Sequence, residues 1–305
     1  MLNEAFHFVY AKRKNKSHND DIWDLCRNWQ TIKKDLRTQL LNGSYQLSPV
    51  VVFGNKGSHR LTRWSSQDAV VLKAVALVLT PIVHNKITQQ CHHIKGNGGL
   101  KGAINRVNDF AKSYKYFIKS DIADYYARMN HAVLINQCSC IIKDKRIIAI
   151  IKQYLNRVEI KNGNHTLIQK GIIKGCSLSP IMGAIMLKSL DDIFSKKYAY
   201  ARYMDDWVIL TNSCALQRRL VKKMHNLVGN LKLKLALAKT YIGKVSKGFD
   251  FLGYHFNAKG LKRLAATTVA NHLLKIAVLY EQNATKSCIQ QYKKNFQSWA
   301  ESGLL

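Results

Sequence analysis

Two adjacent carboxylates, Asp205 and Asp206, occupy the segment ARYMDDWVIL between two apolar and aromatic runs. The flanking runs predict two strands around a tight turn. A second acidic segment, YFIKSDIADYY, places Asp121 at the end of a short apolar strand. Consecutive side chains of extended chain point to opposite faces, so one of the adjacent pair can join Asp121 while the other lies slightly apart.

Clustered carboxylates resist ionising together unless cations neutralise them. Divalent ions that bridge aspartates, about 3.5–4 Å apart, hold both the attacking and the leaving oxygen of a phosphoryl displacement. Mg²⁺ suits such a site because it binds a few carboxylates and completes its shell with water and substrate phosphates. We therefore expect two Mg²⁺ ions, with Mn²⁺ able to substitute. An acidic surface turn is the alternative, and the Asp-Asp pair alone does not exclude it.

The chain is strongly basic, with 48 Lys and Arg against 18 Asp and Glu and a net charge of +30. This excess indicates a polyanionic partner. A membrane surface is the rival, but the apolar run 69–83 is interrupted by Lys73 and is better interpreted as a buried helix. The N-terminus has no secretory signal pattern, and seven cysteines without a CxxC pair favour reduced thiols. These features predict a cytoplasmic protein that binds nucleic acid and no membrane.

The hydrophobic periodicity predicts the elements that must position the acids. Strands are expected over residues 48–53 and 116–122, and a strand–turn–strand over 198–210. Helices are expected over residues 20–41, 67–83, 131–155, 180–193, 215–235 and 267–299.

Five segments, in chain order, resemble the motifs of reverse transcriptases. DIADYY resembles the first palm motif, KGIIKGCSLSPIMGAIMLKSLD the second and YMDD the third. LKLKLALAKT is similar to the fourth, and KGFDFLGYHF resembles the hairpin that grips the primer. The resemblance runs from about Tyr45 to Gly260 and is nearest to bacterial enzymes of the group II intron, group II-like and defence-associated kinds.

The resemblance implies an α+β right-hand polymerase with fingers, an RRM-like antiparallel palm sheet backed by helices, and a reduced helical thumb. The expected fingers cover residues 1–110, the palm 111–256 and the thumb 257–305. The prediction allows part of residues 135–170 to belong to the fingers rather than to the palm.

The resemblance assigns Asp121 and Asp205 as metal ligands with Asp206 as the third acid, and it includes Ile122 in the metal-binding set. Lys239 matches the fourth-motif lysine, which would protonate the departing pyrophosphate as a general acid. An exposed helix-end lysine is the alternative for Lys239.

Tyr126 falls where the family keeps an aromatic steric gate that excludes a 2′-hydroxyl, although a buried palm tyrosine remains the alternative. The family's Pro-Gln-Gly is replaced here by Ile173-Lys174-Gly175. Lys174 adds a positive charge beside the nucleotide, so the nucleotide preference is left open. The resemblance also implies that Gly175 contributes to the nucleotide site. Template and primer contacts are implied for Ser179, Pro180 and Gly253.

The basic segment GNKGSHRLTRW predicts a fingers hairpin that clamps the incoming triphosphate, with Arg60 and Arg63 as the candidate residues. A solvated basic hairpin is the alternative. The glycine-rich HHIKGNGG would let Lys95 and nearby backbone amides meet template phosphates, although a plain turn fits equally well.

These patterns together predict an RNA-directed DNA polymerase in a bacterial defence or retroelement setting. Its expected partners are an RNA template, which a dedicated structured RNA would supply, a DNA primer or product, and dNTPs. An accessory protein or a second copy is a further expected partner. Two alternatives stay open: a template-independent or RNA-synthesising nucleotidyltransferase on the same palm, and a catalytically silent RNA-binding protein.

Overall fold

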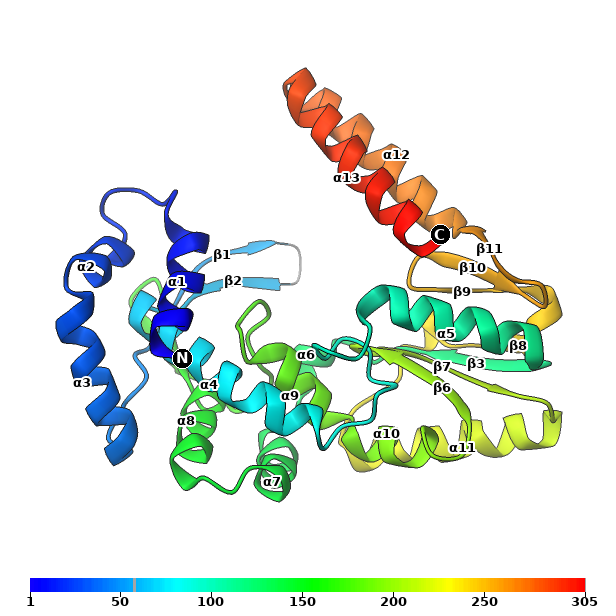
Figure 1. Ribbon diagram of the computed structural model, residues 1–305, viewed down its shortest axis with the longest axis horizontal. Coiled ribbons are helices and arrows are strands. Elements are labelled where there is room, and N and C mark those ends of the chain that lie inside the picture. Colours follow the sequence, from blue (N-terminus) through cyan, green and yellow to red (C-terminus); the bar gives the residue numbers. More distant parts are fainter. Residues whose placement is uncertain (57–58, 305) are drawn as a thin grey trace. The chain divides into compact units, whose positions relative to one another are not determined.

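The computed structural model describes residues 1–56 and 59–304, without the side chains of 55–60 and 303–304 (Figure 1). The chain forms two compact units. The first unit combines residues 1–87, 124–188 and 231–233, and the second combines 88–123, 189–230 and 234–305. The boundaries predicted for fingers, palm and thumb follow function rather than compactness, so they stay a prediction.

The first unit packs helices against a sheet with strand order β2-β1-β4-β5. β1 and β2 form an antiparallel hairpin, and β1 pairs in parallel with β4. The strands are β1 (Val50–Lys56), β2 (His59–Arg63), β4 (Val158–Lys161) and β5 (Asn164–Leu167). The helices are α1 (Leu2–Arg13), α2 (Asp21–Arg27), α3 (Trp29–Asn42), α4 (Ser66–His84), α6 (Tyr125–Arg128), α7 (His131–Ile141), α8 (Lys145–Leu155) and α9 (Ser179–Met186).

α4 is the central helix of the first unit. Its N-terminus is capped by Ser65, whose hydroxyl accepts a hydrogen bond from the Asp68 N–H. In the described part of the chain it is also the one helix long and apolar enough to cross a membrane, but 56% of that stretch is buried inside the protein. It packs on α1, α2 and α9. Burial in a protein core therefore accounts for its composition.

The second unit is built on an antiparallel sheet with strand order β6-β7-β3-β8. Its strands are β3 (Tyr116–Ser120), β6 (Ala199–Tyr203), β7 (Asp206–Thr211) and β8 (Tyr241–Lys244). A smaller sheet holds β9 (Phe249–Phe251), β10 (Tyr254–Asn257) and β11 (Gly260–Leu264). The helices are α5 (Gly99–Ser113), α10 (Lys188–Phe194), α11 (Cys214–Asn230), α12 (Ala266–Glu281) and α13 (Lys286–Leu304), with short 3₁₀ turns η1 (Leu237–Lys239) and η2 (Val245–Lys247).

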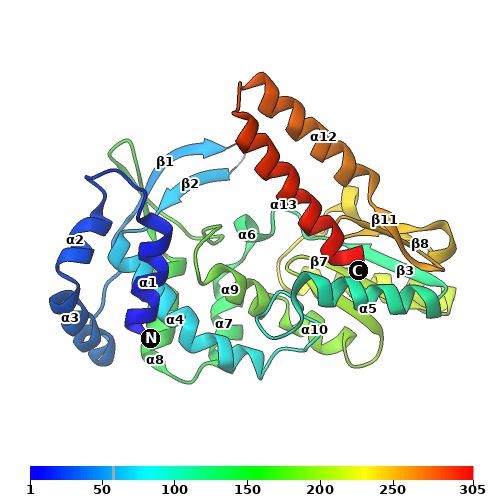
Figure 2. The same ribbon diagram turned by 45° about the horizontal axis from the view of Figure 1, so that its top comes forward.

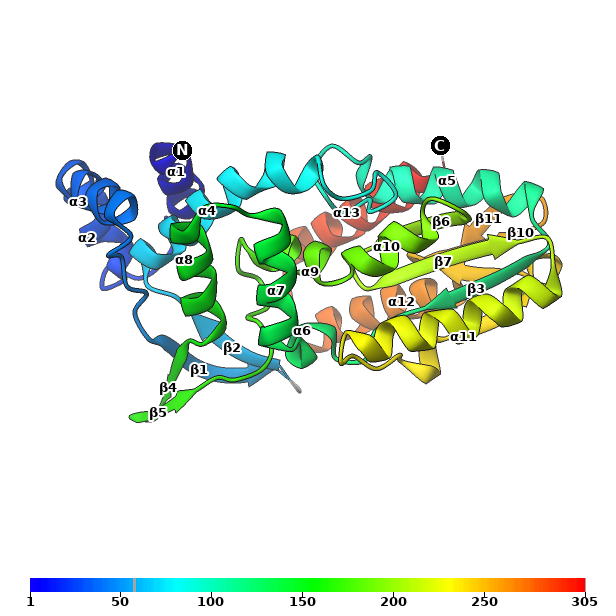
Figure 3. The same ribbon diagram turned by 90° about the horizontal axis from the view of Figure 1, so that it is seen from below.

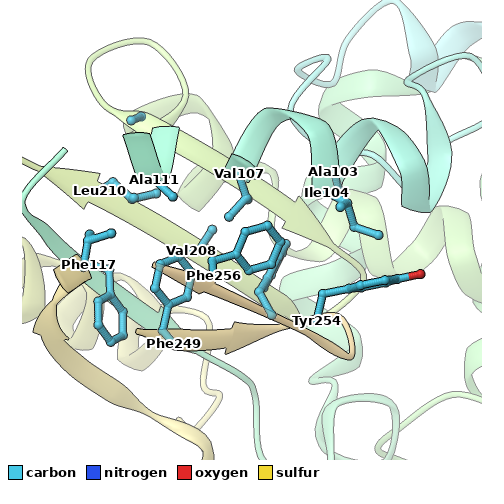
Figure 4. Packing of buried hydrophobic residues seen from close by; sticks show 14 residues of the cluster. Ala103, Ile104, Val107, Ala111, Phe117, Val208, Leu210, Phe249, Tyr254 and Phe256 are labelled. Carbon is cyan, nitrogen blue, oxygen red and sulfur yellow. The ribbon is translucent and has the colours of Figure 1, made fainter. Parts of the chain in front are cut away.

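In chain order the four strands of the larger sheet lie second, third, first, fourth, which is the split order of RRM-like folds. The predicted antiparallel palm sheet is therefore confirmed. α5 and the smaller sheet cover one face, and α11 covers the other (Figures 1 and 2). Between α5 and the two sheets lies an apolar core that includes Val107, Phe117, Val208 and Phe256 (Figure 4).

Four predicted helices are each divided in the structure. The helix expected over 180–193 forms α9 and α10, and the helix expected over 267–299 forms α12 and α13. The helix expected over 20–41 breaks at Asn28, which ends α2 and begins α3. The helix expected over 131–155 breaks before Asp144, whose side chain accepts from the Arg146 N–H and so begins α8. At Asp144, local capping by a short polar side chain competes with a continuous helix. The Asn28 side chain makes no such cap and donates instead to Asp24 Oδ1 in the preceding helix.

Candidate active site

The carboxylates from two parts of the sequence meet at one end of the larger sheet. The last residue pair between β3 and β7 is Ser120 with Trp207. Asp121 follows Ser120 and Asp206 precedes Trp207, so the two acids are opposite each other across neighbouring strands. The Asp121 carbonyl accepts a hydrogen bond of 2.8 Å from the Ala236 N–H, which fixes the chain where it leaves the strand.

Asp205 lies in the turn between β6 and β7. Tyr203 pairs with Asp206, so Met204 and Asp205 form a two-residue turn. The tight turn between two strands was predicted from the sequence, but Asp206 belongs to β7 rather than to the turn. Met204 has φ +57°, in the left-handed region that two-residue hairpin turns require and that non-glycine residues seldom adopt. The tight turn brings Asp205 beside Asp121, and, besides burial, repulsion between their carboxyl groups contributes to raising the pKa of Asp205.

Two lysines face the acids. Lys239 Nζ donates to Asp121 Oδ2 at 2.6 Å, and this hydrogen bond raises the pKa of Lys239. Lys119 Nζ lies 3.7 Å from Asp206 Oδ2. Lys119 is 14% exposed and Lys239 65%, so the first belongs to the site's wall and the second reaches solvent. Lys119 was missed by sequence reasoning, although its place two residues before Asp121 on the same strand face was a usable signal.

The two adjacent acids are harder to ionise than ordinary carboxyl groups. Burial, followed by repulsion from Asp121, raises the pKa of Asp205 to about 6. Burial raises the pKa of Asp206 to about 7, against the opposing effect of Lys119. Charges gathered in a low-dielectric site disfavour the ionised forms unless further cations enter. The two lysines therefore do not fully neutralise the three carboxyl groups of the site.

The site residues fit a divalent cation. Asp121 Oδ1 and Asp206 Oδ1 are buried and accept no hydrogen bond, which is costly for carboxylate oxygens unless a ligand occupies them. Within residues 1–56 and 59–304, no three Asp, Glu, His or Cys side chains are arranged as a complete metal cluster. Lys239 instead engages one Asp121 oxygen. Ile122 is a buried neighbour that forms a bridge with Leu235, and its predicted place in the metal set stays a prediction.

A buried network that the sequence did not predict holds the turn. Arg202 Nη1 donates to the Met204 carbonyl at 2.6 Å, and the Met204 N–H donates to His93 Nδ1 at 3.0 Å. Arg202 also donates to both oxygens of Asp191, which accepts a further hydrogen bond from the Tyr200 hydroxyl. Both backbone polar groups of the left-handed residue are thus fixed by side chains. The one available signal was an arginine in an otherwise apolar strand directly before YMDD.

Tyr126 lies in the first unit, on α6. The Tyr125 hydroxyl donates to the Gly183 carbonyl at 2.6 Å, and a Cβ on Gly183 would lie 3.4–3.5 Å from the rings of both tyrosines. Gly183 therefore makes room for the pair. Tyr126 is half-buried, and its role as a steric gate stays a prediction.

The second motif forms an exposed turn before α9. Lys174 and Gly175 are exposed, and Gly175 has φ +86°, which favours glycine. Ser179 is 2% exposed, and its hydroxyl donates to the Ile173 carbonyl at 2.5 Å. Pro180 stands in the first helical turn, where its missing N–H leaves no hydrogen bond unmade. The first turn of α9 is thus firmly seated, while the predicted nucleotide and template contacts stay predictions.

Both the backbone conformation and the packing at Gly253 require glycine. Its φ is +87°, and a Cβ there would lie 2.8 Å from the Trp299 ring of α13. The turn between β9 and β10 therefore packs tightly on the last helix. This close packing accounts for glycine at the position, and the predicted primer contact stays a prediction.

The remaining predicted contacts lie on exposed basic segments. Arg63 makes an ion pair of 2.9 Å with Asp20 and is half exposed. The side chain of Arg60 lies outside the described residues. Lys95 is exposed in the glycine-rich segment before α5. Their predicted contacts with triphosphate and template stay predictions.

Comparison with known proteins identifies the family. Residues 53–256 match the family described as reverse transcriptase (RNA-dependent DNA polymerase). The chain is 24% identical to protein YkfC of Escherichia coli K12, covering 73% of this chain and 71% of YkfC. It is 22% identical to the group II intron-encoded protein LtrA of Lactococcus lactis subsp. cremoris, covering 81% of this chain and 40% of LtrA.

Solved structures agree on the fold. Apo telomerase from Candida tropicalis superposes with a TM-score of 0.53 at 14% identity, covering 77% of this chain and 53% of that one. Telomerase from Candida albicans, in complex with a TWJ fragment of telomeric RNA, gives 0.57 at 12% identity, covering 80% and 50%. The chain thus spans about half of these telomerases and less of LtrA. The right-hand polymerase fold predicted from the sequence is confirmed.

Proposed function

The chain belongs to the reverse transcriptase family of RNA-dependent DNA polymerases, and on that premise we propose that it copies an RNA template into DNA at the site formed by Asp121, Asp205 and Asp206. The observation that supports this most directly is the pair of buried carboxylate oxygens without partners, Asp121 Oδ1 and Asp206 Oδ1. Such oxygens at the end of a palm-type sheet fit the demand of nucleotidyl transfer for bound cations.

Asp121, Asp205 and Asp206 would hold two Mg²⁺ ions, or Mn²⁺ in their place, with Ile122 beside them. When bound, these ions activate the primer hydroxyl and stabilise the negative charge that develops on the transferred phosphate. The chain's own contribution is to present carboxylates on a rigid sheet end. Lys119 partly neutralises Asp206, so the third acid remains near the site without the full repulsion of three free charges.

Lys239 is proposed as the general acid for the departing pyrophosphate. Its ammonium group is protonated at neutral pH like that of any lysine, and the hydrogen bond with Asp121 raises its pKa further. Its side chain reaches solvent, so the ammonium group can release Asp121 and bind the substrate instead. A proton at Nζ could then pass to the leaving oxygen once substrate competes for the lysine.

The substrates are proposed to be dNTPs, a DNA primer and an RNA template. Tyr126 is the proposed gate against ribonucleotides, and Lys174, Gly175 and Arg63 are proposed to contact the nucleotide. The net charge of +30 supports binding of the nucleic-acid backbone. The similarity to a group II intron-encoded protein supports a retroelement setting, and a bacterial defence setting remains the other proposal. Seven free cysteines support a cytoplasmic location.

The test is primer extension with purified protein, a homopolymer RNA template, a complementary DNA primer and each dNTP separately, in Mg²⁺. We expect incorporation of the complementary dNTP alone. Asp205→Ala and Asp206→Ala should abolish it, because each removes a carboxylate from the cation site. Asp109→Asn, which removes an exposed acid on α5, is the matched control and should retain activity.

Each alternative has its own signature in that assay. Incorporation of every dNTP without regard to template would indicate template-independent transfer. When each rNTP is supplied in place of the matching dNTP, preferred incorporation of the ribonucleotide would indicate RNA synthesis. Tight RNA binding with no incorporation by the wild type would indicate a silent RNA-binding protein. Normal turnover in folded Asp205→Ala would contradict the assigned site.

A further inference from the structure

A basic concavity of about 450 Å³ lies in the first unit, between α7 and α8. Figure 3 shows these helices as neighbours joined by a short segment. We call this concavity the α7–α8 groove. No acidic side chain lines it, and its seven lining residues are Ser139, Ile142, Lys143, Lys145, Ile148, Ala149 and Lys152.

The helical repeat explains the shape of the groove. On α8, Lys145, Ile148, Ala149 and Lys152 are at positions i, i+3, i+4 and i+7, which share one helix face. At 1.5 Å of rise per residue, the two lysines are about 10 Å apart along the axis. Apolar side chains therefore form the middle of the groove, and a lysine stands at each end of its α8 wall.

The three lysines of the groove are not neutralised. Lys143, Lys145 and Lys152 are exposed, and none of them makes an ion pair within residues 1–56 and 59–304. The nearest acid in sequence, Asp144, is held by Arg146 at 2.6 Å, and this arginine lowers the pKa of Asp144 to about 2. The groove thus retains three positive charges.

We propose that the α7–α8 groove binds the phosphate backbone of a second segment of the RNA that carries the template. Two lysines about 10 Å apart along α8, with Lys143 as a third cation lining the groove, match a polymer with repeated charges better than one isolated phosphate. The apolar middle suits the sugar face between phosphates. The inference rests on the proposed function, because that function makes RNA the polyanion that the protein must hold while it copies.

The test compares two RNAs and two charge-matched variants. The groove variant is Lys143→Gln with Lys145→Gln and Lys152→Gln. The control variant is Lys14→Gln with Lys16→Gln and Lys34→Gln, which removes three exposed lysines of the same unit outside the groove. Binding of a long structured RNA and of a short primer–template is measured by fluorescence anisotropy from 50 to 200 mM salt.

For the long RNA, the groove variant should bind roughly tenfold to a hundredfold more weakly. Its slope of log affinity against log salt should fall by about 2, from roughly 0.7 for each lost single-strand phosphate contact. The control variant should change much less. Short primer–template binding and extension should match the wild type in both variants. Lysine acetylation should show protection of Lys145 and Lys152 by the long RNA only.

Three results would overturn the inference. Equal weakening in both variants would show a diffuse charge effect. Unchanged long-RNA affinity and no protection would show that RNA does not occupy the groove. Protection by an acidic peptide but not by RNA would assign a protein partner. Should the triple variant not fold, Lys145→Gln alone and the acetylation pattern decide. Failure of primer extension in the wild type would count against the proposed function. Because anisotropy does not require catalysis, the binding measurements would still decide whether RNA occupies the groove.

Discussion

The hairpin of β6 and β7 and the α7–α8 groove differ in how their charged side chains are placed. Arg202 of the hairpin and Asp191 of α10 are 0% exposed and joined at 2.5 Å, and each is further hydrogen-bonded. In the groove, Lys145 and Lys152 are exposed and lack an acidic partner within the described residues. The buried ion pair holds the hairpin turn in one conformation, whereas the exposed lysines of the groove are available to bind a ligand.

The difference follows from the cost of burial. A buried ion pair is tolerated only when hydrogen bonds satisfy both partners, and removing one partner leaves an uncompensated charge. An exposed lysine has no such cost and gains little from an exposed acid. Changes in the hairpin should therefore affect folding and catalysis, whereas changes in the groove should affect binding. The following predictions test this division.

The largest effect is expected from Asp121→Asn. Removing one negative charge from the cation site should lower kcat at least about a thousandfold, equivalent to roughly 4 kcal/mol of transition-state stabilisation. Steady-state primer extension measures this loss. The groove variant, assayed on the same short primer–template, should retain wild-type kcat. A comparable loss in both would contradict the division between the two regions.

Arg202→Met should destabilise the protein by roughly 3–5 kcal/mol, because Asp191 would be left buried without its cation. Urea unfolding measures the change. Arg218→Met, on the exposed side of α11, is the control and should change stability by less than about 0.5 kcal/mol. The double variant Arg202→Met with Asp191→Leu should recover part of the loss. A double variant less stable than Arg202→Met would contradict the role of the pair.

Asp206→Asn should stabilise the metal-free protein in a pH-dependent manner. Burial raises the pKa of Asp206 to about 7, above the unfolded value of 3.8, so the folded state holds this proton more tightly. Stability of the wild type is favoured at low pH and falls as pH rises through about 7. Asparagine cannot ionise, so the variant should gain roughly 2–4 kcal/mol at pH 8 and much less at pH 5. Thermal unfolding with chelator, at both pH values, tests the sign. An equal gain at both would exclude ionisation as the cause.

The smallest effect is expected from Tyr126→Ala. If the ring excludes the 2′-hydroxyl, its removal should raise the ratio of ribonucleotide to deoxynucleotide use by about tenfold or more, since roughly 1.4 kcal/mol of relieved clash is tenfold. Competing single-nucleotide incorporation measures the ratio. Tyr125→Phe, which removes only the hydroxyl bonded to Gly183, is the control. An unchanged ratio would leave Tyr126 as a packing residue.

The sequence alone determined the fold class and the identity of the acids. Apolar runs that end at Asp121 and at the Asp205–Asp206 turn predict strands, because alternation and turn signals are local properties. Gly175 has a positive φ that favours glycine, but this was not predicted, and its expected place in the nucleotide site stays a prediction. The helix break before Asp144 was not predicted, because a short polar side chain there competes locally with a continuing helix. The break at Asn28 was not predicted either, and no side-chain cap accompanies it.

Only the tertiary structure decided how the acids are supported and neutralised. His93 is far in sequence from Arg202, and the convergence of both on Met204 depends on how the segment before α5 packs against β6, while Asp191 of α10 holds Arg202 in place. Likewise, Lys119 and Lys239 become the counter-charges of the site through strand register and the η1 turn. Burial sets the ionisation of Asp205 and Asp206, and burial arises from contacts distant in sequence rather than from the local pattern.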